Sequence, residues 1–254
     1  MDFTVKYTAN NDEKILIRKI NDLIRQSEKN YAALYSGFLS PAEQTLLSEV
    51  EEFWGYISFS GGYADAERRL CRVCANEYAA DDGAPLILYS LKTTDSHAQI
   101  SHRDVLGSLM GLGIKREMVG DIMAADTAAQ FFCHACIADF VKWNFKKIGR
   151  YPINLQQSEL SEMTAPQRRP LRINISSMRL DCICAECFDI SRTKAAESIK
   201  KGSVTVNWLV CDNNAKEIKS GDKIAMRGKG KVEIVGIRGI SKKGRLFVDV
   251  LQYV

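Results

Sequence analysis

The sequence lacks the features that would direct the chain into or across a membrane. Its first residues, MDFTVKYTANNDEK, have neither the basic n-region nor the apolar h-region of an export signal. The longest apolar runs, such as residues 84–88, are far too short to cross a bilayer. We therefore expect a soluble intracellular protein whose eight cysteines are free thiols. Its 254 residues, 46% of them hydrophobic, suffice for two domains of ordinary size or three small ones.

The sequence also lacks the motifs of several enzyme classes. His102-Arg103-Asp104 has the order of a kinase catalytic loop, but Leu109 stands where that loop needs asparagine. Neither a phosphate-binding glycine loop nor an Asp-Phe-Gly motif accompanies it, so kinase chemistry is excluded. The Gly111-x-Gly113 pair does not open a glycine-rich turn between a strand and a helix, so a dinucleotide fold is not supported. We expect no catalytic residue, cofactor or small-molecule substrate.

Two cysteine pairs allow three interpretations. Cys71-x-x-Cys74 and Cys133-x-x-Cys136 together supply the ligand count of a four-cysteine zinc site, and each pair alone resembles a redox dithiol. Both pairs, however, lie in ordinary apolar patterns, without the glycine or proline turns of a zinc knuckle. Because free cysteine is among the most buried residue types, we favour buried structural thiols over metal or redox chemistry.

Positive charge is concentrated at the C-terminal end. Residues 168–254 hold 18 Lys and Arg against 9 Asp and Glu, a net charge of +9, whereas residues 1–167 carry −5. The alternative is a solvated charged face, in which Glu197 pairs with Lys194 and Lys201 at helical spacing. A basic third attached to an acidic body is typical of a protein that binds a polyanion, so we favour nucleic-acid binding.

The basic third begins with a helix-helix-strand pattern. Apolar residues at i, i+3, i+4 and i+7 from Leu180 predict one short helix. Ser191 is placed to cap a second helix, which Gly202 should end, and Arg192 should emerge near Arg179. Strands are expected over residues 204–207, 223–226 and 246–253. Directly after the strand over 223–226, a loop that contains two glycines carries three cations, Arg227, Lys229 and Lys231.

This segment resembles a known RNA-binding domain. RLDCICAECFDISRTKAAESIKKGSVTVN, followed by KSGDKIAMRGKG, is similar to the S4-type domain of a small-subunit ribosomal protein, tyrosyl-tRNA synthetases and pseudouridine synthases. In that domain two helices present a basic surface to structured RNA. Carried over position by position, the resemblance implies contacts from Arg179, Ser191, Arg192, Lys194, Lys200, Lys201 and Asn207, and we add the three loop cations Arg227, Lys229 and Lys231.

The remaining patterns predict an α+β protein of three domains. Residues 1–75 read as a helical subdomain, with a cap and proline at Ser40-Pro41. Residues 76–160 give the order βαββαβ of a ferredoxin-like, RNA-recognition-like domain. A linker over residues 161–175 then leads into an S4-type domain over 176–254. Base stacking by the middle domain is not favoured, because its only central aromatics, Phe131 and Phe132, point to opposite faces. A possible second RNA site comprises Arg103, Lys115 and Arg116, which flank a helix.

A second resemblance covers almost the whole chain. HRDVLGSLMGLGIKREMVGDI at residues 102–122, FLSPAE at 38–43 and SGGYADAERR at 60–69 are similar to bacterial YlmH-type S4-domain proteins, which also occur in cyanobacterial and plastid lineages. We expect a monomeric, non-catalytic protein in the cytoplasm or, in photosynthetic lineages, the plastid stroma. The resemblance implies binding to rRNA or tRNA, association with the large ribosomal subunit and a part in quality control of stalled translation. An accessory to RNA modification and a cell-division scaffold are the alternatives.

The expected mechanism rests on phosphate contacts. Arginine suits forked phosphate contacts better than lysine does, so Arg179 and Arg192 rank first. We expect alanine at both positions to abolish association with RNA and to leave the thermal transition nearly unchanged.

Overall fold

The computed structural model describes residues 11–76, 79–159, 168–241 and 244–253. The chain divides into two compact units, residues 1–165 and 166–254. This division separates the acidic part of the chain from the basic part. None of the helices that the structure describes is long and apolar enough to cross a membrane.

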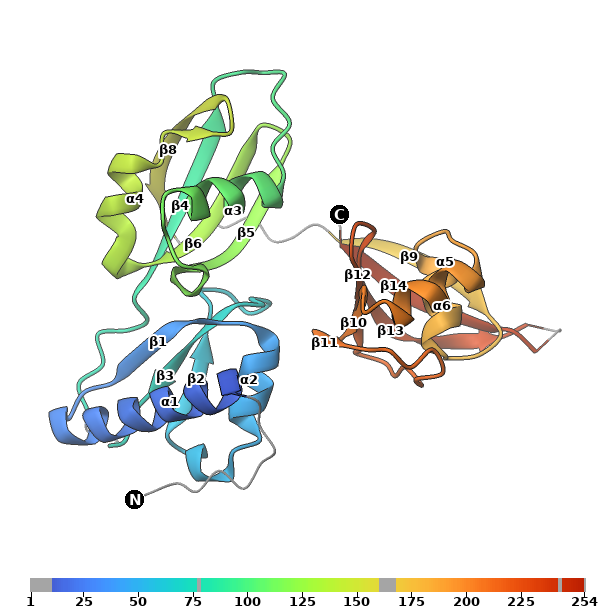
Figure 1. The fold of residues 1–254 in the computed structure, drawn as a ribbon, viewed down its shortest axis with the longest axis horizontal. Coiled ribbons are helices and arrows are strands. Elements are labelled where there is room, and N and C mark those ends of the chain that lie inside the picture. Colours follow the sequence, from blue (N-terminus) through green and yellow to red (C-terminus); the bar gives the residue numbers. More distant parts are fainter. Residues whose placement is uncertain (1–10, 77–78, 160–167, 242–243, 254) are drawn as a thin grey trace. The chain divides into compact units, whose positions relative to one another are not determined.

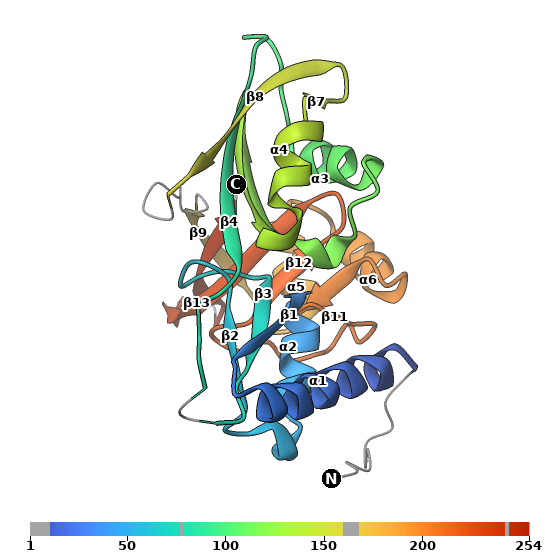
Figure 2. The same ribbon diagram turned by 90° about the vertical axis from the view of Figure 1, so that its left-hand side faces the viewer.

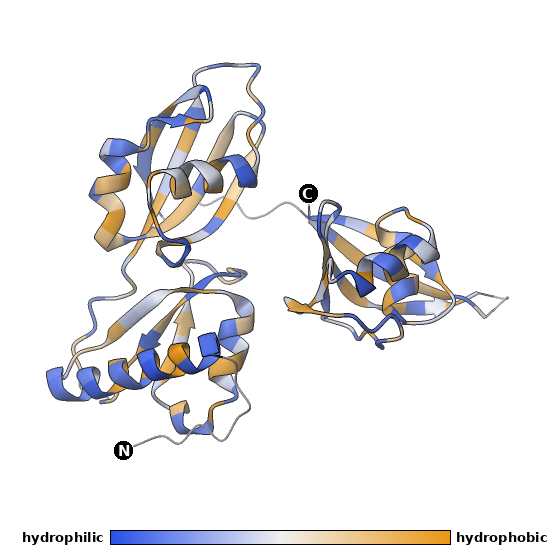
Figure 3. Cartoon of the chain, viewed as in Figure 1, coloured by the Kyte–Doolittle hydropathy of each residue, from blue (hydrophilic) through white to orange (hydrophobic). Residues whose placement is uncertain are grey.

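The first unit begins with a helix-covered sheet (Figures 1 and 2). Its elements are α1 (Asn11–Asn30), β1 (Leu34–Leu39), α2 (Pro41–Ser48), the 3-10 helix η1 (Glu51–Phe53), β2 (Ile57–Ser60) and β3 (Arg69–Val73). The strands pair antiparallel in the order β1-β3-β2. Hydrophilic and hydrophobic residues alternate along α1 (Figure 3), and its buried side, which includes Ile17 and Ile20, packs into a core with Cys71 and Val73 of β3.

The prediction of a helical subdomain was therefore incomplete. Ser40 does cap α2 in a capping box with Glu43, and Pro41 occupies the first turn, as predicted. The three strands were missed because β1 pairs with β3 across the intervening α2, η1 and β2, which local periodicity does not reveal, and because β2 and β3 are short.

The rest of the first unit is a five-stranded antiparallel sheet in the order β5-β6-β4-β8-β7. Its elements are β4 (Leu86–Thr93), α3 (His102–Gly111), η2 (Arg116–Met118), β5 (Val119–Ala125), β6 (Ala128–His134), η3 (Ala135–Ile137), α4 (Ala138–Asn144), β7 (Lys147–Ile148) and β8 (Tyr151–Ser158). The predicted βαββαβ order is confirmed, with the short β7 inserted. Both α3 and α4 cover one face of the sheet (Figures 1 and 2), over a core that includes Tyr89, Phe131 and Val141.

The opposite face of this sheet is covered at one end by the N-terminal sheet. Phe38 of β1 and Leu70 of β3 share an apolar cluster with Leu88 of β4 and Phe132 of β6. Tyr63 stacks on Phe132 with 5.8 Å between ring centroids. The two sheets therefore pack as one unit, and neither Phe131 nor Phe132 is exposed to stack on a base.

A half-buried carboxylate fixes the same joint. Asp121 of β5 accepts a hydrogen bond from the Tyr63 hydroxyl at 2.8 Å and one from the backbone N–H of Arg68 at 3.0 Å. Gly120 leaves room for the neighbouring sheet, since an added Cβ would lie 2.6 Å from the Phe38 ring. The FLSPAE, SGGYADAERR and HRDVLGSLMGLGIKREMVGDI segments all contribute residues to this joint.

The second unit is a six-stranded antiparallel sheet with two helices on one face. The strands run in the order β11-β10-β12-β13-β14-β9. Its elements are β9 (Arg168–Ile175), α5 (Leu180–Cys187), α6 (Arg192–Lys200), β10 (Val204–Val206), β11 (Leu209–Val210), β12 (Lys223–Met226), β13 (Gly230–Ile240) and β14 (Leu246–Tyr253). Residues 168–175 of the predicted linker are strand β9, paired along its length with β14. Residues 161–167 of that linker lie outside the described residues.

Candidate nucleic-acid interface

Helices α5 and α6 are held against the sheet by a continuous core. Leu180, Ile183 and Cys184 of α5 and Ala195 and Ile199 of α6 are all buried in it. The Ser191 hydroxyl accepts a hydrogen bond from the backbone N–H of Lys194, so it caps α6 as predicted. The core thus fixes both helices, and the cationic residues of α6 face solvent.

Arg179 and Arg192 meet at the N-terminal ends of these helices, on either side of one buried carboxylate. The Arg179 guanidinium donates from Nε and Nη2 to the two oxygens of Asp181, at 3.1 and 2.9 Å. The Arg192 guanidinium donates from Nε and Nη2 to Oδ2 of the same carboxylate, at 3.1 and 3.0 Å. Asp181 is 5% exposed, whereas the arginine side chains are 41% and 54% exposed. Two cations share one anion, and the group keeps a net charge of +1.

The pairing sets the ionisation of Asp181. Burial alone raises the pKa of this carboxyl, but hydrogen bonds from Arg179 and Arg192 outweigh it and lower the pKa to about 2. The carboxylate is therefore ionised at neutral pH and locks both guanidinium planes. Each guanidinium has five N–H donors and gives two of them to Asp181, which leaves the outer edges available to a ligand.

This geometry corrects one prediction made from the sequence. Arg179 and Arg192 were expected to contribute little to stability, but they are the partners of a buried carboxylate. Removal of both would leave that charge uncompensated, which is strongly destabilising. Asp181 itself was interpreted only as a favourable charge in the first helical turn. Its place in the sequence between two apolar residues, Leu180 and Cys182, both buried in the structure, is the signal that could have indicated its burial.

Further cations extend from this pair along α6. Lys194, Lys200 and Lys201 are exposed, and no ion pair joins any of them to Glu197 within the described part of the chain. The backbone N–H of Arg227 donates to the carbonyl of Ser203 at 2.9 Å, so the β12–β13 turn lies beside the C-terminal end of α6. Arg227 and Lys229 are exposed on that turn.

Two predicted contacts have other surroundings. Lys231 lies opposite Tyr253 in the β13–β14 register, away from the helices, with its ammonium 3.9 Å from the ring centroid. Burial lowers the pKa of Lys231 to about 8, against an opposing effect of Glu233. The amide of Asn207 bonds to the Asp222 carboxylate at 2.8 Å and to the Lys223 backbone N–H at 2.9 Å. Lys231 lies away from the helices because side chains alternate between the two faces of β13. Asn207 makes its own contacts because it lies in the turn between β10 and β11.

A hollow of about 340 Å³ opens beside Arg192. It is lined by residues from β9, the two helices and the start of β14: Ile175, Ser176, Cys182, Ala185, Glu186, Asp189, Ile190, Arg192 and Arg245. Arg245 donates to the Asn174 carbonyl and lies 3.5 Å from Glu186. The edge of the surface is thus recessed and carries charges of both signs.

The proposed second site does not form one cationic surface. Ser101 and Asp104 make a capping box for α3, and Arg103 and Lys115 are exposed. Arg116 instead turns inward and donates to the carbonyls of Val119 and Gly120. Burial, together with the nearby Arg68, lowers the pKa of Arg116 to about 10. Arg116 therefore holds the start of β5 rather than facing solvent.

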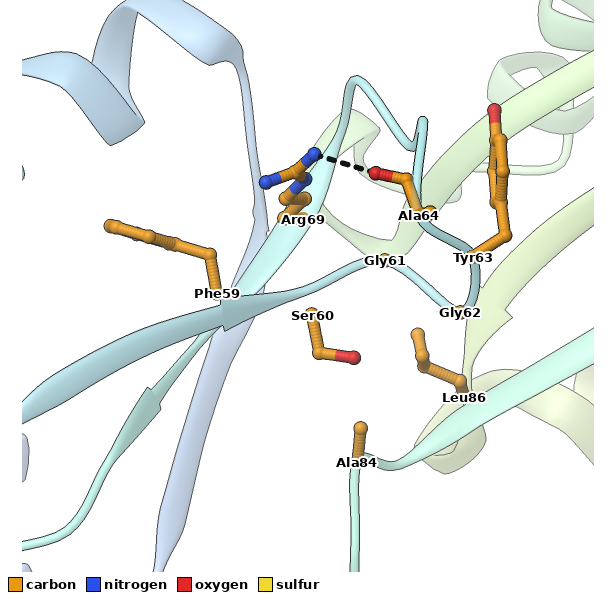
Figure 4. Close-up of a pocket in the computed structure, with 9 residues that line it drawn as sticks. All are labelled: Phe59, Ser60, Gly61, Gly62, Tyr63, Ala64, Arg69, Ala84 and Leu86. Carbon is orange, nitrogen blue, oxygen red and sulfur yellow. Dashed lines mark hydrogen bonds between the residues drawn. The ribbon is translucent and has the colours of Figure 1, made fainter.

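A second hollow, of about 440 Å³, adjoins that joint. Figure 4 shows its lining: Phe59, Ser60, Gly61, Gly62, Tyr63, Ala64, Arg69, Ala84 and Leu86. The Arg69 guanidinium in this lining donates to the carbonyls of Ala66 and Ala64 at 2.7 and 3.1 Å. This charge is therefore engaged in holding the loop.

The cysteine pairs lie in separate parts of the first unit. Cys71 in β3 and Cys133 in β6 are buried, and burial raises the pKa of each thiol to about 12. Cys74 is half-buried and Cys136 is exposed, so the expectation of burial holds for one member of each pair. No group of three potential metal ligands occurs among the residues that the structure describes.

Comparison with known proteins identifies the family. Residues 82–162 match the model of a putative RNA-binding domain in YlmH, and residues 178–224 match the S4 domain. The chain is 33% identical over 239 residues to ribosome-associated protein quality control protein P2 of Bacillus subtilis, covering 92% of this chain and 93% of that protein. The chain belongs to the YlmH family of S4-domain proteins. A fold likeness, with a TM-score of 0.50 and 19% identity, relates 63% of this YlmH-family chain to 98% of the Streptococcus pneumoniae cell division protein YlmH.

Proposed function

We propose that this YlmH-family protein is a non-catalytic binder of structured RNA, either rRNA or tRNA, and that its S4 domain makes the contact. The observation that carries the proposal is the pair of arginines oriented by buried Asp181, with exposed lysines continuing along α6. The proposed contact residues are Arg179, Ser191, Arg192, Lys194, Lys200, Lys201, Arg227 and Lys229.

Affinity should come mainly from phosphates. A fixed guanidinium loses less conformational entropy on binding than a free one, so Asp181 preorganises the two arginines for forked contacts. The lysines supply point charges that need no exact geometry. With about six phosphate contacts, RNA binding should weaken roughly a thousandfold between about 50 and 200 mM salt. The Ser191 hydroxyl, at the same end of α6, is placed for a sugar 2′-hydroxyl.

The likeness to a ribosome-associated quality control protein supports a site of action. We propose association with the large ribosomal subunit, in the cytosol or plastid stroma, as a monomer that holds tRNA or rRNA when translation stalls. A division-site scaffold would instead bind its partner in high salt and after nuclease treatment.

Lys194→Ala/Lys200→Ala/Lys201→Ala tests the surface without disturbing Asp181. Because all three side chains are exposed, the variant should fold normally. It should bind an RNA hairpin at least tenfold more weakly at about 50 mM salt, and the slope of log affinity against log salt should fall by roughly 2–3.

The matched control removes three exposed cations from α1 of the acidic unit, as Lys14→Ala/Arg18→Ala/Lys29→Ala. Fluorescence anisotropy with the hairpin and co-sedimentation with ribosomes measure both variants. Equal losses in the two variants would mean that overall charge alone matters, and the assignment of the site to α6 would be wrong.

A further inference from the structure

An exposed aromatic patch interrupts the acidic surface of the first unit. Phe140 and Trp143, three residues apart on α4, are 46% and 67% exposed. The ammonium groups of Lys142 and Lys146 lie 5.7 and 5.9 Å from the centroid of the Trp143 ring. These four residues form what we call the α4 patch. Figure 3 shows the hydrophilic and hydrophobic residues side by side on this helix.

The patch is the exposed aromatic surface of its domain. Of the described residues in 82–162, Phe140 and Trp143 are the large apolar side chains that face solvent. The sheet face on which an RNA-recognition motif stacks bases is covered by Phe38 and Tyr63, which bury Phe132. An aromatic platform in this domain therefore lies on the helical side.

Charge identifies the partner. Residues 135–158 contain four Lys and Arg and one acid, within a region of 167 residues whose net charge is −5. A protein partner with an apolar surface would have to desolvate the ammonium groups beside the indole. A nucleotide satisfies both features at once, because its base stacks on the ring and its phosphate accepts from the lysines.

We propose that the α4 patch is a second RNA-contacting surface, which holds an unpaired nucleotide by stacking the base on Trp143. The two lysines must move aside for the base: each gives up an exposed cation–π contact, and Lys146 also gives up its hydrogen bond to the Lys142 carbonyl. Stacking of one base on an aromatic ring contributes about 1–3 kcal/mol, and the displaced ammonium groups gain phosphates in exchange. This surface does not depend on the S4 domain, so the two proposals can fail separately.

Tryptophan fluorescence of the full chain reads out the contact directly. With Trp54→Phe and Trp208→Phe, Trp143 is the one remaining tryptophan, and an oligouridylate of about a dozen nucleotides at about 50 mM salt should quench it as uracil stacks. The matched control keeps Trp54 alone. Trp54 is 63% exposed, like Trp143, but Glu49, Glu51 and Glu52 lie just before it in the sequence, and its emission should not change.

Affinity provides the second arm. Trp143→Ala should weaken oligouridylate binding about 5- to 150-fold, Trp143→Phe should retain most of the affinity, and Trp54→Ala should retain all of it. Quenching of Trp143 should persist in Lys194→Ala/Lys200→Ala/Lys201→Ala, which separates this surface from the one on α6.

Three results would overturn the proposal: no quenching of Trp143, equal quenching of Trp54, or equal quenching of Trp143 by a polyphosphate that has no bases. A photoreactive benzoylphenylalanine in place of Trp143 should crosslink RNA on purified ribosomes. Crosslinks to ribosomal protein alone would identify a protein partner and would also reject the assignment.

Discussion

Arg192→Ala should destabilise the S4 domain because buried Asp181 loses one of the two guanidinium groups that stabilise its charge. The pKa of Asp181 is about 2 in the folded chain, against an ordinary value of 3.8. This difference corresponds to roughly 2 kcal/mol of stabilisation at neutral pH, supplied mainly by the two guanidinium groups. Arg179 retains both of its contacts in the variant, and Arg192 is 54% exposed, so its share is discounted. We expect the free energy of unfolding to fall by about 1 kcal/mol.

The assay needs a probe confined to the second unit. Trp208 lies there, whereas Trp54 and Trp143 are exposed in the first unit, so Trp54→Phe/Trp143→Phe leaves a fluorescence signal specific to the S4 domain. Urea unfolding of this protein is compared with that of the same protein carrying Arg192→Ala. Lys194→Ala is the control, since Lys194 lies on the same helix and is exposed; its cost should stay within about 0.5 kcal/mol.

A double-mutant cycle decides the cause. In the Asp181→Asn background, Arg192→Ala should cost less than half of what it costs beside the aspartate, because the charge it balances is gone. An equal cost in both backgrounds, or a cost no greater than that of Lys194→Ala, would refute the role given to the pair.

Two further predictions concern pH and packing. Because the folded-state pKa of Asp181 is depressed, the stabilisation that its carboxylate provides is present above pH 3.8 and is lost as pH falls toward 2. The difference in unfolding free energy between the wild-type protein and Asp181→Asn should therefore shrink over that range. A difference that grows on acidification would contradict the pairing. Gly120→Ala should destabilise the first unit by about 1–3 kcal/mol, because the new methyl group would lie 2.6 Å from Phe38, whereas Gly107→Ala in α3 meets nothing within 4 Å and should be neutral or stabilising. Thermal unfolding followed by Trp143 fluorescence measures the stability of both glycine variants. Equal effects of Gly120→Ala and Gly107→Ala would contradict the close approach of Gly120 to Phe38.

Elements with strong local signals were predictable from the sequence. Strand β14 begins at Leu246 and ends at Tyr253 as expected, β12 matches its predicted range, and Ser40 and Ser191 cap their helices. In each case the pattern that specifies the element lies within a few residues of it. Hydrophobic periodicity and cap chemistry act over such distances.

Features that depend on distant partners were not predictable in the same way. Strand β9 exists because residues 168–175 pair with β14, more than seventy positions later. The alternation of side chains in β13, once its register is fixed, carries Lys231 away from the helices and onto Tyr253. Arg116 looks like a surface cation in the sequence, but in the structure it is partly buried near Arg68 and donates to the carbonyls of Val119 and Gly120.

The cover over the middle sheet has a consequence for how this chain can be divided. The matched RNA-binding domain model starts at residue 82, after Phe38, Gly62 and Tyr63. A fragment cut there would leave Leu88 and Phe132 bare and would deprive Asp121 of the Tyr63 hydroxyl. The start of the matched domain is thus not a boundary of folding. The smallest fragment in which the middle domain folds should also contain the N-terminal sheet.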